Sequence, residues 1–100
     1  MPGSKLYRVH PDAWSEIEAA DDWYLQRSPE ASASFMAAIY DAFERISDAP
    51  KRWPRYLFGT RRFVLHRFPF SISYLDGPSV VNFVAFAHSK RKPGYWKRRV

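Results

Sequence analysis

The end of the sequence, residues 88–100, holds the side chains whose types and spacing could do chemistry. This stretch carries six Lys or Arg residues, His88 and the adjacent aromatics Tyr95 and Trp96, with no carboxylate among them. Cations stabilise negative charge developing on phosphorus, imidazole and phenol groups move protons, and aromatic rings stack on unpaired bases. This set of cationic, imidazole, phenol and aromatic side chains fits metal-independent cleavage of a phosphodiester in RNA. It fits the binding of an acidic protein equally well, and residue types alone do not separate these cases.

Other kinds of site have little support in the sequence. His10, His66 and His88 are far apart and form no HxxxH or HExxH motif, so we predict no metal site. The absence of cysteine leaves no disulfide or thiolate ligand. Asp76 is the single carboxylate of the second half, which argues against a pair of catalytic carboxylates there. We therefore predict no metal and no cofactor.

A predicted strand leads directly into this basic tail. Residues 80–88 are mostly apolar, which indicates a strand in the interior of a sheet. Such a strand would hold the start of the tail rigidly, as functional groups need to be held. Strands are also predicted at 61–68 and 70–75, with turn residues at 76–79. The short connections make these three strands an antiparallel meander.

The first half of the chain predicts one short strand and two helices. Residues 5–10 alternate between apolar and polar, as strands do. Helix-entry signals at His10-Pro11-Asp12 and Ser28-Pro29 open two amphipathic helices, which end near Arg27 and before Pro50. On the first helix, Glu16 is predicted to lie away from the apolar face. The whole chain, residues 1–100, is thus a single α+β domain of order β-α-α-β-β-β, with a helical hairpin packed on one face of a mainly antiparallel sheet.

Charge divides sharply between the two halves. Residues 1–50 contain four Lys or Arg and nine Asp or Glu, whereas residues 51–100 contain twelve Lys or Arg and one carboxylate. The net charges of −5 and +11 account for the total of +6 and predict one acidic and one basic surface. No secretory signal or membrane-spanning run is visible, so a cytoplasmic location is expected.

These features together resemble the RelE/ParE superfamily of bacterial toxins from type II toxin–antitoxin modules. The resemblance rests on the element order, on the strand Phe68-Pro69-Phe70-Ser71-Ile72-Ser73-Tyr74, and on the ending His-x-x-Arg-x-Pro-x-Tyr-Trp from His88 to Trp96. It implies a growth-inhibiting toxin that a cognate antitoxin protein neutralises. ParE-like members, associated with plasmid stabilisation, inhibit DNA gyrase, and RelE-like members cleave ribosome-bound mRNA. We favour the ParE-like branch, with the metal-independent endoribonuclease as the alternative and a non-toxic nucleic-acid-binding module as a lesser one.

The resemblance also assigns roles to individual residues. Lys90 and Arg91 fall where ribonuclease members carry basic residues after the last strand, and Tyr95 lies near their C-terminal tyrosine. In a ribonuclease, His88, Arg91 and Tyr95 would be the catalytic residues. Ser71, however, stands where many ribonuclease members have a functional arginine, which favours the ParE-like branch. The residues predicted to bind the target or the antitoxin are Arg61, Arg62, Lys90, Arg91, Trp96 and Arg98.

Overall fold

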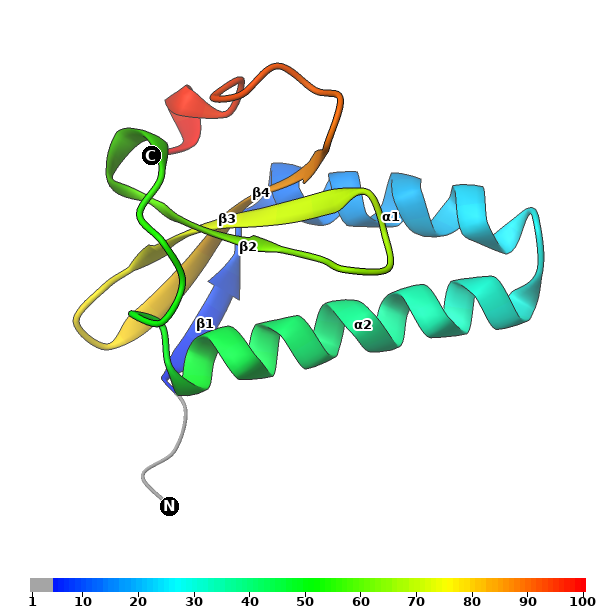
Figure 1. The fold of residues 1–100 in the computed structure, drawn as a ribbon, viewed down its shortest axis with the longest axis horizontal. Helices are drawn as coiled ribbons and strands as arrows, with labels where there is room; N and C mark the ends of the chain where they lie inside the picture. The colour runs from blue at the N-terminus through cyan, green and yellow to red at the C-terminus, as the bar shows by residue number, and fades with distance from the viewer. Residues whose placement is uncertain (1–4) are drawn as a thin grey trace.

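The computed structural model describes residues 5–100, and their elements follow the order predicted from the sequence (Figure 1). The elements are β1 (Leu6–Val9), α1 (Pro11–Leu25), α2 (Pro29–Asp48), the 3-10 turn η1 (Leu57–Gly59), β2 (Arg61–Val64), β3 (Phe70–Asp76), β4 (Val80–His88) and the 3-10 turn η2 (Lys97–Arg99). The predicted β-α-α-β-β-β fold is therefore confirmed.

Both helices begin at the predicted entry signals. Nδ1 of His10 accepts a hydrogen bond of 3.0 Å from a backbone N–H in the first turn of α1, and Oγ of Ser28 accepts one of 2.9 Å at the start of α2. Pro11 and Pro29 occupy first-turn positions, where the missing N–H would have no helical partner. The loop between the helices is short, so α1 and α2 lie antiparallel, as Figure 1 shows.

The strands form one mixed sheet in the order β1-β4-β3-β2. β4 lies in the interior of the sheet. It pairs in parallel with β1, where Val9 lies opposite Phe83, and antiparallel with β3, where Ile72 lies opposite Phe86. β2 pairs antiparallel with β3 at the far edge. The predicted strand before the basic tail, β4, thus has a neighbouring strand on each side.

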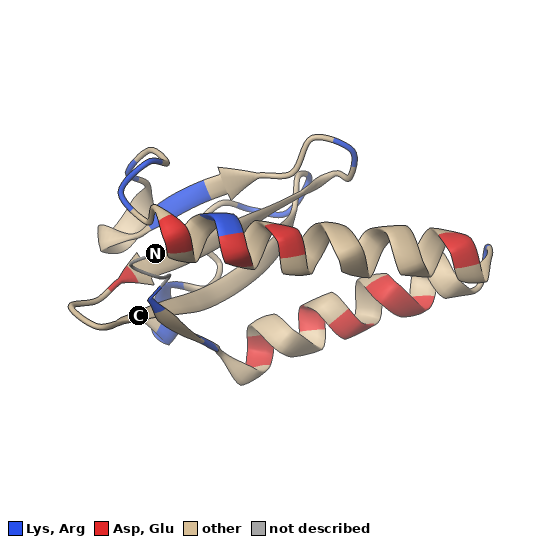
Figure 2. Cartoon of the chain, turned by 90° about the horizontal axis from the view of Figure 1, so that it is seen from below, with Lys and Arg blue, Asp and Glu red and all other residues tan. Residues whose placement is uncertain are grey.

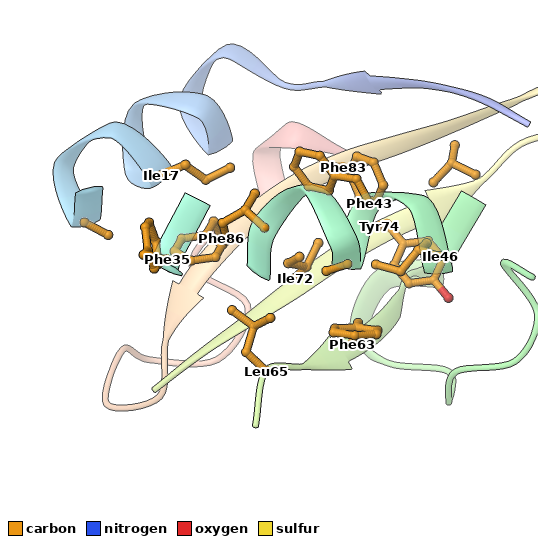
Figure 3. Close-up of a cluster of buried hydrophobic side chains, with 14 residues drawn as sticks. Ile17, Phe35, Phe43, Ile46, Phe63, Leu65, Ile72, Tyr74, Phe83 and Phe86 are labelled. Atoms are coloured by element: carbon orange, nitrogen blue, oxygen red, sulfur yellow. The ribbon is translucent and has the colours of Figure 1, made fainter. Parts of the chain in front are cut away.

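The helical hairpin packs on one face of this sheet and encloses the main hydrophobic core (Figure 3). The rings of Phe43 from α2 and Phe83 from β4 stack with their centroids 4.2 Å apart. Ile17 contributes from α1. The apolar face of the predicted second amphipathic helix, α2, is buried; it consists of Phe35, Ile39, Phe43 and Ile46.

β2 ends at Val64, whereas the sequence predicted a strand that continues to Phe68. The backbone N–H of Leu65 donates to the carbonyl of Phe70 at 3.0 Å, which closes the hairpin and leaves residues 66–69 as its turn. Phe68 folds back from this turn and packs against the main core. The sequence extended the predicted strand to Phe68 because this residue is apolar. An apolar residue that packs on the core from a turn cannot be told from one in a strand by sequence alone.

The two charged surfaces also form as predicted. Figure 2 shows the carboxylates concentrated along the two helices, and the lysines and arginines mostly on the strands and loops beyond them. Arg45 on α2 is an exception. Asp76 carries the carboxylate of the basic half, and it forms an ion pair with Lys5.

Candidate functional site

β4 contains a bulge where the basic tail packs against it. Tyr74 pairs with Phe83 and the preceding Ser73 pairs with Ala85, so Val84 is an extra residue in β4. As a result, Val84 and Ala85 are both buried in a second hydrophobic cluster that is separate from the main core. Its largest member is Trp96 from the tail, which is 2% exposed.

Glu16 of α1 binds the edge of β4 beyond the end of β1. β1 ends at Val9, opposite Phe83, so the backbone N–H of Phe86 has no strand partner on that side. This N–H donates to Oε1 of Glu16 at 3.0 Å. The carboxylate therefore replaces a strand at this point and joins the helix to the sheet.

The same carboxylate holds the tail. The hydroxyl of Tyr95 donates to Oε2 of Glu16 at 2.6 Å, and the guanidinium of Arg99 donates to both carboxylate oxygens at 2.9 and 3.0 Å. Arg99 also donates to the carbonyl of Val84 at 3.1 Å, beside the bulge. The tail is thus fixed by a fork-shaped ion pair and by the burial of Trp96.

These contacts alter the acidity of both partners. Burial alone would raise the pKa of Glu16, but the hydrogen bonds from Arg99 and Tyr95 outweigh it and hold that pKa below its ordinary value. Burial and the hydrogen bond to Glu16 both raise the pKa of Tyr95 well above its ordinary value. Glu16 is therefore charged and Tyr95 neutral at physiological pH.

The structure brings the three candidate catalytic residues near one another but gives each of them a partner within the protein. The guanidinium of Arg91 lies 3.8 Å above the ring of Tyr95 and 3.8 Å from Glu16. His88 is exposed at the end of β4, and its Nδ1 accepts a hydrogen bond of 3.0 Å from the backbone N–H of Lys90. The side chain of His88 remains accessible, whereas Tyr95 is half-buried.

The candidate binding residues differ in their availability. The guanidinium of Arg61 donates to the carbonyl of Trp53 at 2.7 Å, so it fixes the connector before β2. The guanidinium of Arg62 lies 4.4 Å above the ring of Tyr56. Trp96 is an anchor in the second cluster and presents almost no surface. Lys90, Arg91 and Arg98 are exposed.

Comparison with known protein families identifies the chain. The family model described as the ParE toxin of the type II toxin–antitoxin system parDE matches residues 7–93. The chain belongs to the ParE toxin family. A solved structure of the chromosomal ParDE toxin–antitoxin system from P. aeruginosa has the same fold, with a TM-score of 0.73 over 85% of this chain and 96% of that chain, at 17% identity. No curated protein matches the sequence.

Family membership confirms the resemblance found in the tail and strand motifs: this is a ParE-like toxin of a type II toxin–antitoxin system. None of the helices within residues 5–100 is both long and apolar enough to cross a membrane. In the same part of the chain, no group of three or more His, Asp or Glu side chains is placed to hold a metal ion.

Two residues that organise the tail of this ParE toxin were missed by the sequence reasoning. Glu16 lies off the apolar stripe of α1, as predicted, but faces the sheet edge and the tail instead of solvent. A signal for it existed, since a tail with six cations and no carboxylate needs a negative partner elsewhere. No pattern distinguishes Arg99 from the adjacent Arg98, and the structure alone shows that Arg99 carries the ion pair.

An open groove of about 450 Å³ runs between α1 and the ends of β3 and β4 in this ParE toxin. The small side chain of Ala19 leaves space in the groove, and Trp23, which is half-exposed, forms one wall. Phe70 and Phe86 contribute apolar surface. Arg91, which is exposed, lines the groove together with Glu16, 3.8 Å away, so the groove combines an apolar surface with an ion pair whose cation is accessible.

Proposed function

We propose that this ParE toxin stops growth by binding and inhibiting DNA gyrase, and that it does not cleave RNA. The observation that supports this most is the contact between Tyr95 and Glu16. A proton carrier in RNA cleavage needs a suitable pKa and access to the substrate. The hydroxyl of Tyr95 instead donates a hydrogen bond to Glu16 at 2.6 Å. Burial and that hydrogen bond raise the pKa of Tyr95. The tyrosine therefore stabilises the tail.

The hydrogen bond at His88 gives further support. Because Nδ1 accepts the N–H of Lys90, the neutral imidazole carries its proton on Nε2. In that tautomer the accessible nitrogen donates a hydrogen bond and has no free lone pair with which to act as a base. Tyr95 is thus held by Glu16, and neutral His88 has no free nitrogen that could act as a base.

The alternative, a RelE-like mRNA endonuclease, is favoured by one observation. A small polar pocket between the sheet and the tail gathers side chains of the type that hold a phosphate; it includes Arg62, Ser71, Ser73, His88, Arg91 and Lys92. With a volume of about 60 Å³, it is large enough for little more than a phosphate group. Binding of RNA there would require Arg91 to leave the ring of Tyr95.

One experiment separates the two functions. The toxin is induced briefly in cells, and plasmid supercoiling and the integrity of translated mRNA are measured in the same culture. We expect relaxed plasmid with intact message, and the same result from the double variant His88→Gln/Tyr95→Phe. Cut message with normal supercoiling, abolished in the double variant, would show the ribonuclease instead. Purified gyrase with wild-type toxin then tests the inhibition directly.

We also propose that a cognate antitoxin neutralises the toxin by placing an apolar and acidic segment in the groove beside α1. The apolar walls suit the packed face of such a segment, and the cation of Arg91 suits its carboxylates. The variant Trp23→Ala removes one wall of the groove. We expect it to remain toxic but to escape rescue by the co-expressed antitoxin, whereas Tyr40→Ala, which removes an equally exposed aromatic from α2, should be rescued normally.

A further inference from the structure

We infer that Leu57 and Phe58, at the turn η1, form the apolar centre of the surface that binds the toxin's target. Their partner is a protein surface with an apolar pocket ringed by carboxylates. The inference rests on the proposed function to the extent that it takes the target to be a protein. It adds which part of the toxin makes the contact and what chemistry the contact has.

The backbone of Phe58 is the first indication. Its φ and ψ angles are 57° and 40°. Among residues 5–100, no other non-glycine residue has a positive φ. Bulky side chains rarely adopt this left-handed conformation, which asparagine and glycine tolerate. Phe58 is nevertheless 44% exposed. Packing therefore covers only part of this side chain, and strained residues of this kind concentrate at functional sites.

The loop that presents these two residues is firmly held. Thr60 is buried, and both its hydroxyl and its backbone N–H donate to the carbonyl of Leu57, at 2.6 and 3.1 Å. The backbone N–H of Tyr56 donates to the carbonyl of Thr60 at 2.8 Å. The turn is closed by its own hydrogen bonds, so Leu57 and Phe58 keep a fixed position before any partner arrives, which lowers the entropy lost on binding.

The tail braces the loop from one side; Figure 1 shows η1 and η2 close together. The ring of Phe58 packs edge-on against Trp96, with centroids 5.7 Å apart. Gly94, with φ of 80°, passes so close that a Cβ there would lie 3.0 Å from the ring of Phe58. The second cluster therefore supports an exposed aromatic side chain, and the tail contributes to its position.

The charges around the loop define the partner. The ammonium of Lys97 lies 5.3 Å from the ring centre of Phe58, and Arg55 and Arg98 are exposed on the segments that carry the loop and the tail. Asp76 is the single Asp or Glu in residues 51–100, and its charge is neutralised by an ion pair with Lys5. An apolar centre with a cationic rim matches an acidic protein surface with a pocket. The aliphatic side chain of Leu57 cannot stack on bases, which favours a protein over a nucleic acid.

The variant Phe58→Asn tests the inference at little net cost to the fold, because asparagine relieves the backbone strain while the loss of the ring removes the contact with Trp96. Purified wild type, Phe58→Asn and the control Tyr40→Ala are compared in gyrase supercoiling and in urea unfolding. We expect Phe58→Asn to unfold at a denaturant concentration close to that of wild type, because the relieved strain offsets the lost contact with Trp96, and to need about tenfold more protein for inhibition. Tyr40→Ala, which lacks an equally exposed ring on α2, should inhibit as wild type does.

Normal inhibition by Phe58→Asn would overturn the inference and leave gyrase inhibition standing. If wild type fails to inhibit gyrase, the proposed function fails, and growth arrest by the same three proteins then decides the inference: retained arrest by Phe58→Asn overturns it, and lost arrest supports it. Binding to plasmid DNA and to single-stranded RNA without gyrase is measured in parallel. A loss of nucleic-acid affinity that accounts for the loss of inhibition would assign the surface to nucleic acid and overturn the protein partner.

Discussion

The hydroxyl of Tyr95 lies 2.6 Å from Oε2 of Glu16, a residue 79 positions earlier in the sequence. This contact joins the basic tail to the acidic helical hairpin. It also determines what the phenol of Tyr95 can do, because burial and the hydrogen bond to the carboxylate raise its pKa. The tail's position on the sheet is therefore set by a residue of α1.

Glu16→Gln is expected to destabilise the toxin by about 1.5 to 3 kcal/mol, the range for hydrogen bonds to a charged group. The glutamine keeps the shape of the side chain but loses the charge that binds Arg99, leaving that largely buried guanidinium with only the exposed carboxylate of Asp12, 3.8 Å away, as its ion-pair partner. Glu18→Gln, at an exposed position of the same helix, should change stability by less than about 0.5 kcal/mol. Urea unfolding of the two variants measures both effects, and equal stabilities would contradict the central role of Glu16.

The contribution of Glu16 should depend on pH in one direction. Its pKa in the folded protein is lower than its ordinary value of about 4.5, so the unfolded chain binds the proton first as the pH falls. The stabilisation is thus fully present above that ordinary value and is lost as the pH falls through the folded pKa. The stability difference between wild type and Glu16→Gln should be constant near neutrality and shrink in acid. A difference that grows below pH 4.5 would mean that the charge of Glu16 opposes folding.

Most of the fold followed from local patterns. The stripe from Phe35 to Ile46 has helical spacing, Ser28 and Pro29 mark a helix start, and the apolar run of β4 has the length of a buried strand, so each element could be recognised within a short window. The family could be recognised as well, because the motif from His88 to Trp96 is local.

The site was harder to predict because its contacts are long-range. Glu16 and Arg99 are 83 positions apart, and neither lies in a motif that specifies the other. The bulge at Val84 is invisible in an apolar run, yet it helps to bury Trp96 in a second cluster. The sequence likewise gave no indication of the left-handed backbone at Phe58, because phenylalanine rarely adopts that conformation. Sequence patterns report local periodicity, whereas these features depend on how distant segments meet.

Trp96→Ala is expected to cost about 3 to 5 kcal/mol, the usual range for truncating a large buried aromatic. Its ring is 2% exposed and fills the cluster with Val84 and Ala85. Trp23→Ala should cost less than about 1 kcal/mol, because half of that side chain is already in solvent. Thermal or urea unfolding compares the two. Similar small losses would mean that the tail is not anchored by Trp96 in solution.

The adjacent residues Arg98 and Arg99 provide the sharpest test of the tail's attachment. Arg99→Lys keeps the charge but removes the fork that contacts both oxygens of Glu16 and the carbonyl of Val84. We expect a loss of about 1 to 2 kcal/mol in urea unfolding, in the range of a charge-assisted hydrogen bond. Arg98→Lys alters an exposed side chain and should be nearly neutral. In the background of Glu16→Gln, the cost of Arg99→Lys should fall by at least half, because the two residues act through one interaction. Strictly additive losses would show that Arg99 stabilises the tail through other contacts.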